Sequence, residues 1–195
     1  MAEVELPNPE ELRELKEKTF TRRVALVTAV FAVALAITSL GGSNAMKEML
    51  LAQQQSSDQW AFYQAKVIRE HLYRSERMRL ELDLLAAGDS LKPEARQQME
   101  EMLKKLSAEE ERYRDEKKEI EQEAKKLEHE RDMNRSKDPY FDYGEVLLQI
   151  AIVMASISIL ALSRQVFYFA VVVAAIGAVM SLNGFFLLFR IPFLH

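Results

Sequence analysis

Carboxylates and histidines are the side chains of this sequence that could carry out acid–base or metal chemistry. The carboxylates gather in runs such as Glu100-Glu101 and Glu109-Glu110-Glu111, and the three histidines lie far apart, at positions 71, 129 and 195. There is no cysteine. Catalysis needs positioned, desolvated groups in a concavity, whereas these carboxylates lie in charged stretches typical of a solvated helix. We therefore predict that the protein is not an enzyme and has no catalytic residue, cofactor or metal site.

A second set of polar side chains lies in or beside long apolar runs. Glu145 and Gln149 are four residues apart on one helical face, and Asn183 lies at a similar depth in a later run. Polar groups within a bilayer often hydrogen-bond neighbouring helices, which contributes about 0.6–2 kcal/mol. They can also line a pathway for ions. We predict a Gln149–Asn183 contact, with a polar pathway through the membrane as the alternative.

The elements that must position these groups follow from the segregation of charge along the chain. Residues 24–42, 146–163 and 165–189 carry no charged side chain. Each run is long enough to cross a hydrocarbon core of about 30 Å as a helix. The sequence therefore predicts an all-α membrane protein, with transmembrane helices at 24–42, 145–163 and 166–189. The last two form a transmembrane helical hairpin within 139–189.

Charged segments flank the predicted transmembrane helices. Segment 1–23 is expected to form an amphipathic helix, and its glutamates, together with the long apolar run after it, disfavour a cleaved signal peptide. Residues 190–195 form a short tail. Between 43 and 138 there are 19 Lys and Arg residues against 22 Asp and Glu residues. This near balance disfavours nucleic-acid binding, which needs a strong basic excess.

Residues 43–138 contain two long runs without Pro or Gly, separated by a turn pattern at 87–93. Gly41-Gly42 is expected to break the first helix and Pro139 to end the second. Two arms of equal length about one turn predict a long antiparallel coiled-coil hairpin, between the first and second transmembrane helices.

Each predicted arm has a heptad seam of mostly apolar residues. The seam of the first arm is Ala61, Ala65, Ile68, Leu72, Ser75, Arg79 and Leu82, and that of the second arm is Met99, Met102, Leu106, Tyr113, Ile120, Ala124 and Leu127. Pairing of the arms would bring Leu72 near Leu106 and Ala65 near Tyr113.

A second face of the first arm is then left without a mate within the hairpin. Its residues are Trp60, Tyr63, Val67 and His71. Aromatic residues anchor protein interfaces, so this is a candidate interaction face. The plainer alternative is packing between helices, the usual role of such side chains. If the face is free, we expect a homo-oligomer with the first arms inside and the second arms outside.

Aromatic residues also precede the second apolar run. Tyr140, Phe141 and Tyr143 are expected to lie in the interfacial belt of the membrane. Three spans place the N-terminus on one side of the membrane, with the hairpin and the C-terminus on the other. The basic residues nearest the spans favour a cytoplasmic N-terminus and a periplasmic or extracellular hairpin.

Three stretches resemble a family of small bacterial membrane proteins known only as a domain of unknown function. They are LGGSNAMKEMLLAQQQSSDQWAFYQAKVIREHLY, PYFDYGEVLLQIAIVMASISIL and SLNGFF. The run SDQWAFYQAK at 57–66 is the most specific of them. The resemblance implies this architecture and a bacterial source, and we expect the protein to lie in the bacterial inner membrane. It implies no reaction, ligand or site.

These patterns together predict a non-enzymatic, membrane-anchored coiled-coil protein. It would act as an oligomeric scaffold, or as an accessory subunit that presents its hairpin to a partner protein of a membrane complex. The alternative is an oligomeric channel or a transport-associated protein with a polar pathway through its spans.

Overall fold

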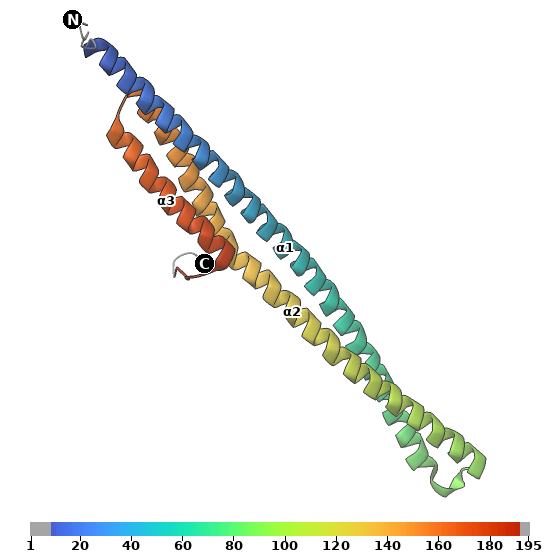
Figure 1. Ribbon diagram of the computed structural model, residues 1–195. Helices are drawn as coiled ribbons and strands as arrows, with labels where there is room; N and C mark the ends of the chain where they lie inside the picture. The colour runs from blue at the N-terminus through green and yellow to red at the C-terminus, as the bar shows by residue number, and fades with distance from the viewer. Residues whose placement is uncertain (1–8, 192–195) are drawn as a thin grey trace, which may run out of the picture. The chain divides into compact units, whose positions relative to one another are not determined.

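The computed structural model describes residues 9–191, which form helices joined by short connections and a short segment, 187–191, after the last helix (Figure 1). Helix α1 spans Pro9–Ala87 and is followed by a short 3-10 turn, η1, at Gly88–Ser90. Helix α2 spans Pro93–Leu160, and α3 spans Arg164–Phe186. The chain forms two compact units. The first unit takes in the chain up to Glu48 and from Met133 onward, and the second is Met49–Asp132.

The two adjacent glycines do not break α1, so the expectation that Gly41-Gly42 ends the first helix is wrong. A glycine within a helix costs about 1 kcal/mol relative to alanine, too little to end a helix that is held by tertiary packing. The missing side chain makes room for a neighbour instead. A Cβ atom at Gly41 would lie 2.6 Å from the rings of both Phe141 and Phe185. The glycine pair therefore marks a helix contact within the first unit.

Helix α2 continues through Pro139, so the expected end of the second arm at this residue is wrong. Proline in a helix interior costs about 3 kcal/mol, because it removes a backbone donor and crowds the preceding turn. The two residues that follow it, Tyr140 and Phe141, are each only 2% exposed. Burying a large apolar side chain gains about 1.5–3 kcal/mol, so these two together offset the cost of the proline.

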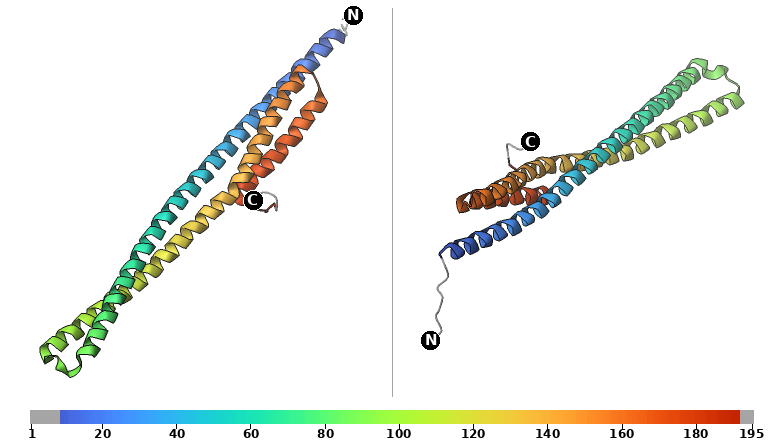
Figure 2. Two further views of the ribbon diagram at one scale, coloured as in Figure 1. Left: turned by 180° about the vertical axis from the view of Figure 1, so that it is seen from behind. Right: turned by 90° about the horizontal axis from the view of Figure 1, so that it is seen from above.

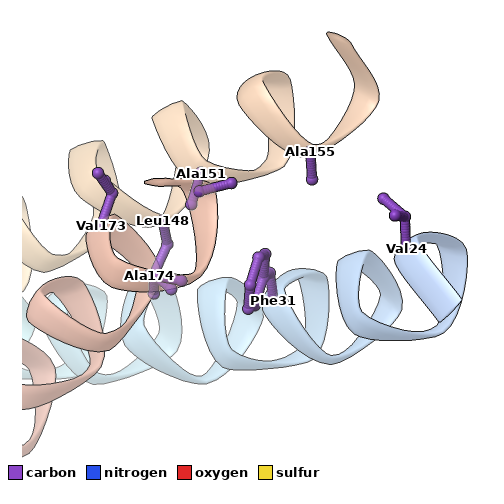
Figure 3. Close-up of a cluster of buried hydrophobic side chains, with 8 residues drawn as sticks. Val24, Phe31, Leu148, Ala151, Ala155, Val173 and Ala174 are labelled. Carbon is purple, nitrogen blue, oxygen red and sulfur yellow. The ribbon is translucent and has the colours of Figure 1, made fainter. Parts of the chain in front are cut away.

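The first unit is a three-helix packing of the N-terminal part of α1, the C-terminal part of α2 and α3, which lie side by side (Figures 1 and 2). Its core consists of Val24, Phe31, Leu148, Ala151, Ala155, Ala170, Val173 and Ala174. Figure 3 shows Val24 and Phe31 of α1 pointing toward α2. Half of the core residues are alanines, which allow the helix backbones to approach closely.

Helices α2 and α3 are in close contact at a pair of glycines. A Cβ atom at Gly144 would lie 3.1 Å from the carbonyl oxygen of Gly177, and one at Gly177 would lie 3.0 Å from the carbonyl oxygen of Gly144. Next to this contact, the hydroxyl oxygens of Thr38 and Ser181 are 2.8 Å apart, which links α1 to α3 by a buried hydrogen bond. Glycine and hydroxyl contacts of this kind are typical of helices packed within membranes.

All three helices are long and apolar enough to cross a membrane, as judged by length and composition. In their most apolar windows only 17%, 28% and 22% of the residues are buried. Large apolar side chains such as Leu26, Val30 and Leu40 are more than 60% exposed. The predicted all-helical fold with three apolar helices is confirmed, and most residues in the apolar windows of those helices are not buried within the protein.

Candidate functional site

The second unit is a helical hairpin made by the C-terminal part of α1, the turn η1 and the N-terminal part of α2 (Figure 1). Cross-arm contacts run along its length, and positions later in α1 pair with positions earlier in α2. They include Gln53 with Arg131, Trp60 with Glu128, Lys66 with Glu116, and Arg74 with Glu110. The predicted long hairpin between two helices is therefore confirmed, and its arms are antiparallel.

The aromatic face of the first arm points toward the second arm, so the expectation that it is left without a mate is wrong. Trp60, Tyr63 and Val67 are half-buried, and only His71 is exposed. The indole Nε1 of Trp60 donates a 3.0 Å hydrogen bond to Glu128. Its ring also packs edge-on against Tyr63, with a centroid distance of 5.3 Å. These aromatic residues pack between the two helices, as the plainer alternative predicted.

The second arm uses most of its predicted seam, but its partners differ from those expected. Leu106, Tyr113, Ala124 and Leu127 are buried, whereas Met102 is 55% exposed. Tyr113 stacks on Tyr73 at 5.4 Å between centroids, and not on Ala65, which is exposed. The predicted contact of Leu72 with Leu106 is also wrong, because Leu72 is on the outer surface.

Two carboxylates buried between the arms were not foreseen. Glu110 accepts hydrogen bonds from Nε of Arg74 at 2.8 Å and from Nε of Arg77 at 2.9 Å. Glu70 accepts one of 2.6 Å from Lys117 and one of 2.9 Å from Arg74. We call these five residues the charged cluster.

Electrostatics keeps both carboxylates of the charged cluster ionised. The hydrogen bond from Lys117 is the largest influence on the pKa of Glu70 and lowers it, against an opposing effect of desolvation. For Glu110 the hydrogen bond from Arg74 is the largest influence, and it also lowers the pKa. Because charge-assisted hydrogen bonds satisfy these groups, the cluster is a structural lock between the arms.

The predicted seam of the first arm lies on the outside of the hairpin. Ile68, Leu72 and Leu82 are 68%, 55% and 64% exposed, and Ala61, Ala65, Ser75 and Arg79 are exposed too. These seven residues, which we call the heptad stripe, keep alternating spacings of four and three residues over three heptads. Phe62 and Leu85, 61% and 78% exposed, flank the stripe and widen it. It is the candidate functional surface of the second unit.

The predicted contact between Gln149 and Asn183 does not form. The amide nitrogen of Gln149 donates to Glu145 on the same helix, at 3.2 Å. Asn183 is fully buried and bonds the backbone of Phe189 in both directions, at 2.8 and 2.9 Å. Asn183 therefore holds the segment that follows α3, which is a structural role that spacing alone did not reveal.

The three predicted interfacial aromatics do not share one environment. The hydroxyl of Tyr140 donates to the carbonyl of Phe189 at 3.3 Å and accepts from the backbone N–H of Ile191 at 2.9 Å. Phe141 fills the space beside Gly41 and Gly184. Both rings are buried among helices, and these internal contacts take up their surface. Their place in the interfacial belt stays a prediction. Tyr143 is 55% exposed.

Within residues 9–191, no group of three or more His, Asp or Glu side chains is placed to hold a metal ion. The carboxylates of the charged cluster are bonded to arginine and lysine, which occupy their acceptor positions. Little in the sequence indicates that these two carboxylates are buried. Glu70 and Glu110 each have an arginine four residues later, but this spacing is also common on solvated helices.

The fold therefore defines a class of all-helical proteins with three helices long and apolar enough to cross a membrane, two of which also form a long helical hairpin. A comparison with protein families matches residues 20–187 to a domain of unknown function, DUF4337, and the chain belongs to this family. The comparisons with curated proteins and with solved structures found no match.

Proposed function

We propose that this protein is a non-enzymatic, membrane-anchored coiled-coil scaffold that assembles from several copies through the heptad stripe. The observation that carries the proposal is the stripe itself. It has the 3.5-residue period of a coiled-coil seam, yet the hairpin leaves it exposed. A hairpin that buries one face and repeats a heptad on another has a second mating surface. An assembled hairpin could also serve as an accessory subunit for another membrane protein.

A second copy of the chain fits the stripe for reasons of geometry and charge. Copies anchored in one membrane present their first arms in parallel, and parallel helices with apolar residues every 3.5 positions pack knobs into holes. When equivalent stripe positions of two copies lie at the same level, His71 of one copy lies opposite Glu76 of the next, and Gln64 lies opposite Arg69. These flanking positions carry no like-charge clash. Arg79 within the stripe would restrict register at some cost in stability.

The membrane anchor is proposed from the outward-facing apolar surface of the first unit. Helices with more than 70% of an apolar window unburied need an apolar solvent, and a bilayer supplies one. We place the chain in a bacterial inner membrane as a multi-pass protein. The N-terminus is assigned to the cytoplasm and the hairpin to the periplasmic or extracellular side.

The alternative of a channel has less support. Asn183, one of the polar residues that suggested it, is committed to the backbone of Phe189. Glu145 and Gln149 bond each other within one helix. Neither observation favours a continuous polar pathway over the scaffold.

Cysteine crosslinking tests the scaffold directly, because the chain has no native cysteine. Ser75→Cys places one thiol in the middle of the heptad stripe. In membranes treated with an oxidant or a short bismaleimide, we expect a covalent dimer, because equivalent seam positions of parallel helices face each other. The yield is read by gel electrophoresis under non-reducing conditions.

The matched control is Ser107→Cys, another exposed serine, which lies on the second arm. It should give little dimer under the same treatment. Equal crosslinking of the two variants would indicate random collision and contradict assembly through the stripe. Absence of a dimer from Ser75→Cys, with thiol labelling intact, would contradict it as well.

The orientation is tested at the hairpin turn. Ser90→Cys places a thiol in η1, where the native hydroxyl bonds the carbonyl of Ala87. An impermeant maleimide added to intact cells should label this variant as strongly as it does in lysed cells. Labelling only after lysis would place the hairpin in the cytoplasm and reverse the assignment.

A further inference from the structure

A cleft of about 370 Å³ lies between the first turns of α1 and the start of α3, within the first unit. Three cations, Lys16, Arg23 and Arg164, line it together with apolar and aromatic side chains. On the aromatic side, Phe20 and Phe167 meet edge to face with a centroid distance of 6.0 Å. The cleft therefore combines positive charge with an apolar wall.

Within residues 9–191, no acidic side chain neutralises the cations of the cleft. No carboxylate of these residues lines the cleft, and none of them lies within 4 Å of any of the three cations. Lys16 and Arg23 are seven residues apart, so they lie on the same face of α1. Arg164 faces them as the first residue of α3. Three unpaired cations that converge on one cleft attract an anion.

The position of the cleft along the helices narrows the choice of anion. Arg23 is the last charged residue before the apolar run of α1, and Arg164 directly precedes the apolar run of α3. The cations therefore lie where charged sequence gives way to apolar sequence, the level at which phosphates of lipid headgroups lie in a membrane. A ligand with a phosphate and long apolar chains matches both walls.

A neighbouring cleft on another side of α1 shows the contrast. It is lined by Lys18 and Arg22 but also by Glu14 and Glu17, so its charges balance. Lys18 additionally pairs with Glu14 at 3.7 Å. Similar numbers of cations thus occur on both sides, and only one side leaves them free for an external anion.

We propose that the cleft of Lys16, Arg23 and Arg164 binds one anionic glycerophospholipid. Its phosphate lies between the three cations, and its acyl chains run along the apolar wall of Phe20 and Phe167. The site requires that the first unit is inserted in a membrane, but it does not depend on self-association through the heptad stripe.

Native mass spectrometry of the full-length protein in detergent tests this site. The probes are phosphatidylglycerol and phosphatidylcholine with identical acyl chains. The wild type should retain one phosphatidylglycerol in preference to phosphatidylcholine. The triple variant Lys16→Gln/Arg23→Gln/Arg164→Gln should bind phosphatidylglycerol more weakly by about tenfold or more, because each cation near an anionic headgroup contributes to affinity.

The control triple Arg13→Gln/Lys18→Gln/Arg22→Gln removes the same charge from the same end of α1 but leaves the cleft intact. It should bind within about twofold of the wild type, well inside the tenfold loss that removing the cleft cations should cause. Equal losses in the two triples would show diffuse surface attraction and overturn the site. Equal retention of the two lipids by the wild type would overturn the site as well. Displacement of the lipid by excess inorganic phosphate would also overturn it and would indicate a site for free phosphate.

Circular dichroism checks that each variant stays helical, and the single variant Arg164→Gln repeats the test with a smaller change.

Discussion

Leucine in place of Gly177 is expected to push α2 and α3 apart and to lower the stability of the first unit by about 1–3 kcal/mol, the usual range for overpacking. A Cβ atom at this position would lie 3.0 Å from the carbonyl oxygen of Gly144 and 3.1 Å from the Cβ of Leu147. A carbonyl group held in a helix cannot move aside as a flexible side chain can. The larger side chain must therefore separate the two backbones.

The measurement is the thermal unfolding of the purified protein in detergent, followed by circular dichroism. Ala175→Leu is the matched control, because it adds a leucine to the same helix at an exposed position. The control should melt like the wild type. Similar melting of both variants and the wild type would show that the glycine contact does not hold α2 against α3.

The glycines and the proline show where local sequence rules gave the wrong boundaries. Gly41-Gly42 and Pro139 are strong helix breakers by intrinsic propensity. Both lie where helices of the first unit contact one another. Burial of Tyr140 and Phe141 offsets the local cost of the proline, and the glycines make room for the rings of Phe141 and Phe185. Propensity describes the isolated segment, whereas each contact depends on residues that are far away in the chain. Charge segregation and run length were sufficient to predict the three apolar helices.

The sequence does not predict which face of the first arm packs against the second arm, and the reason is different. The first arm carries two faces that could mate, one through Trp60 and one through Ile68, and periodicity favours the second. The structure uses the first, because the second arm offers Glu128 to the indole and Glu110 to the arginines. Those partners come from the opposite arm, so the pattern of one helix read alone could not rank the two faces.

Loss of the buried carboxylates is expected to destabilise the hairpin at neutral pH. In the variant Glu70→Gln/Glu110→Gln the arginines and Lys117 lose their charged acceptors. We expect the unfolding midpoint of the second unit to fall by roughly 5 °C or more, since about 1 kcal/mol shifts a unit of this size by 4–8 °C. Trp60, the only tryptophan, lies in this unit and reports its unfolding by fluorescence.

The same two carboxylates set the response of the hairpin to acid. Their pKa values in the folded protein lie below the usual value of 4.5, because cationic neighbours stabilise the ionised forms. The unfolded chain therefore takes up protons first as the pH falls. The stability that they contribute is present in full above about pH 4.5 and is lost as the pH falls through the lowered values. The wild type should accordingly lose stability over this range, whereas Glu70→Gln/Glu110→Gln should lose much less.

A matched pair of exposed carboxylates separates this effect from the overall charge. The variant Glu119→Gln/Glu130→Gln removes the same two charges from the outer surface of the second arm. It should follow the wild type in both midpoint and acid response, because exposed charges contribute little to stability. If this control lost as much stability as the buried pair, net charge would govern the hairpin. If Glu70→Gln/Glu110→Gln melted like the wild type at every pH, the charged cluster would not be a lock between the arms.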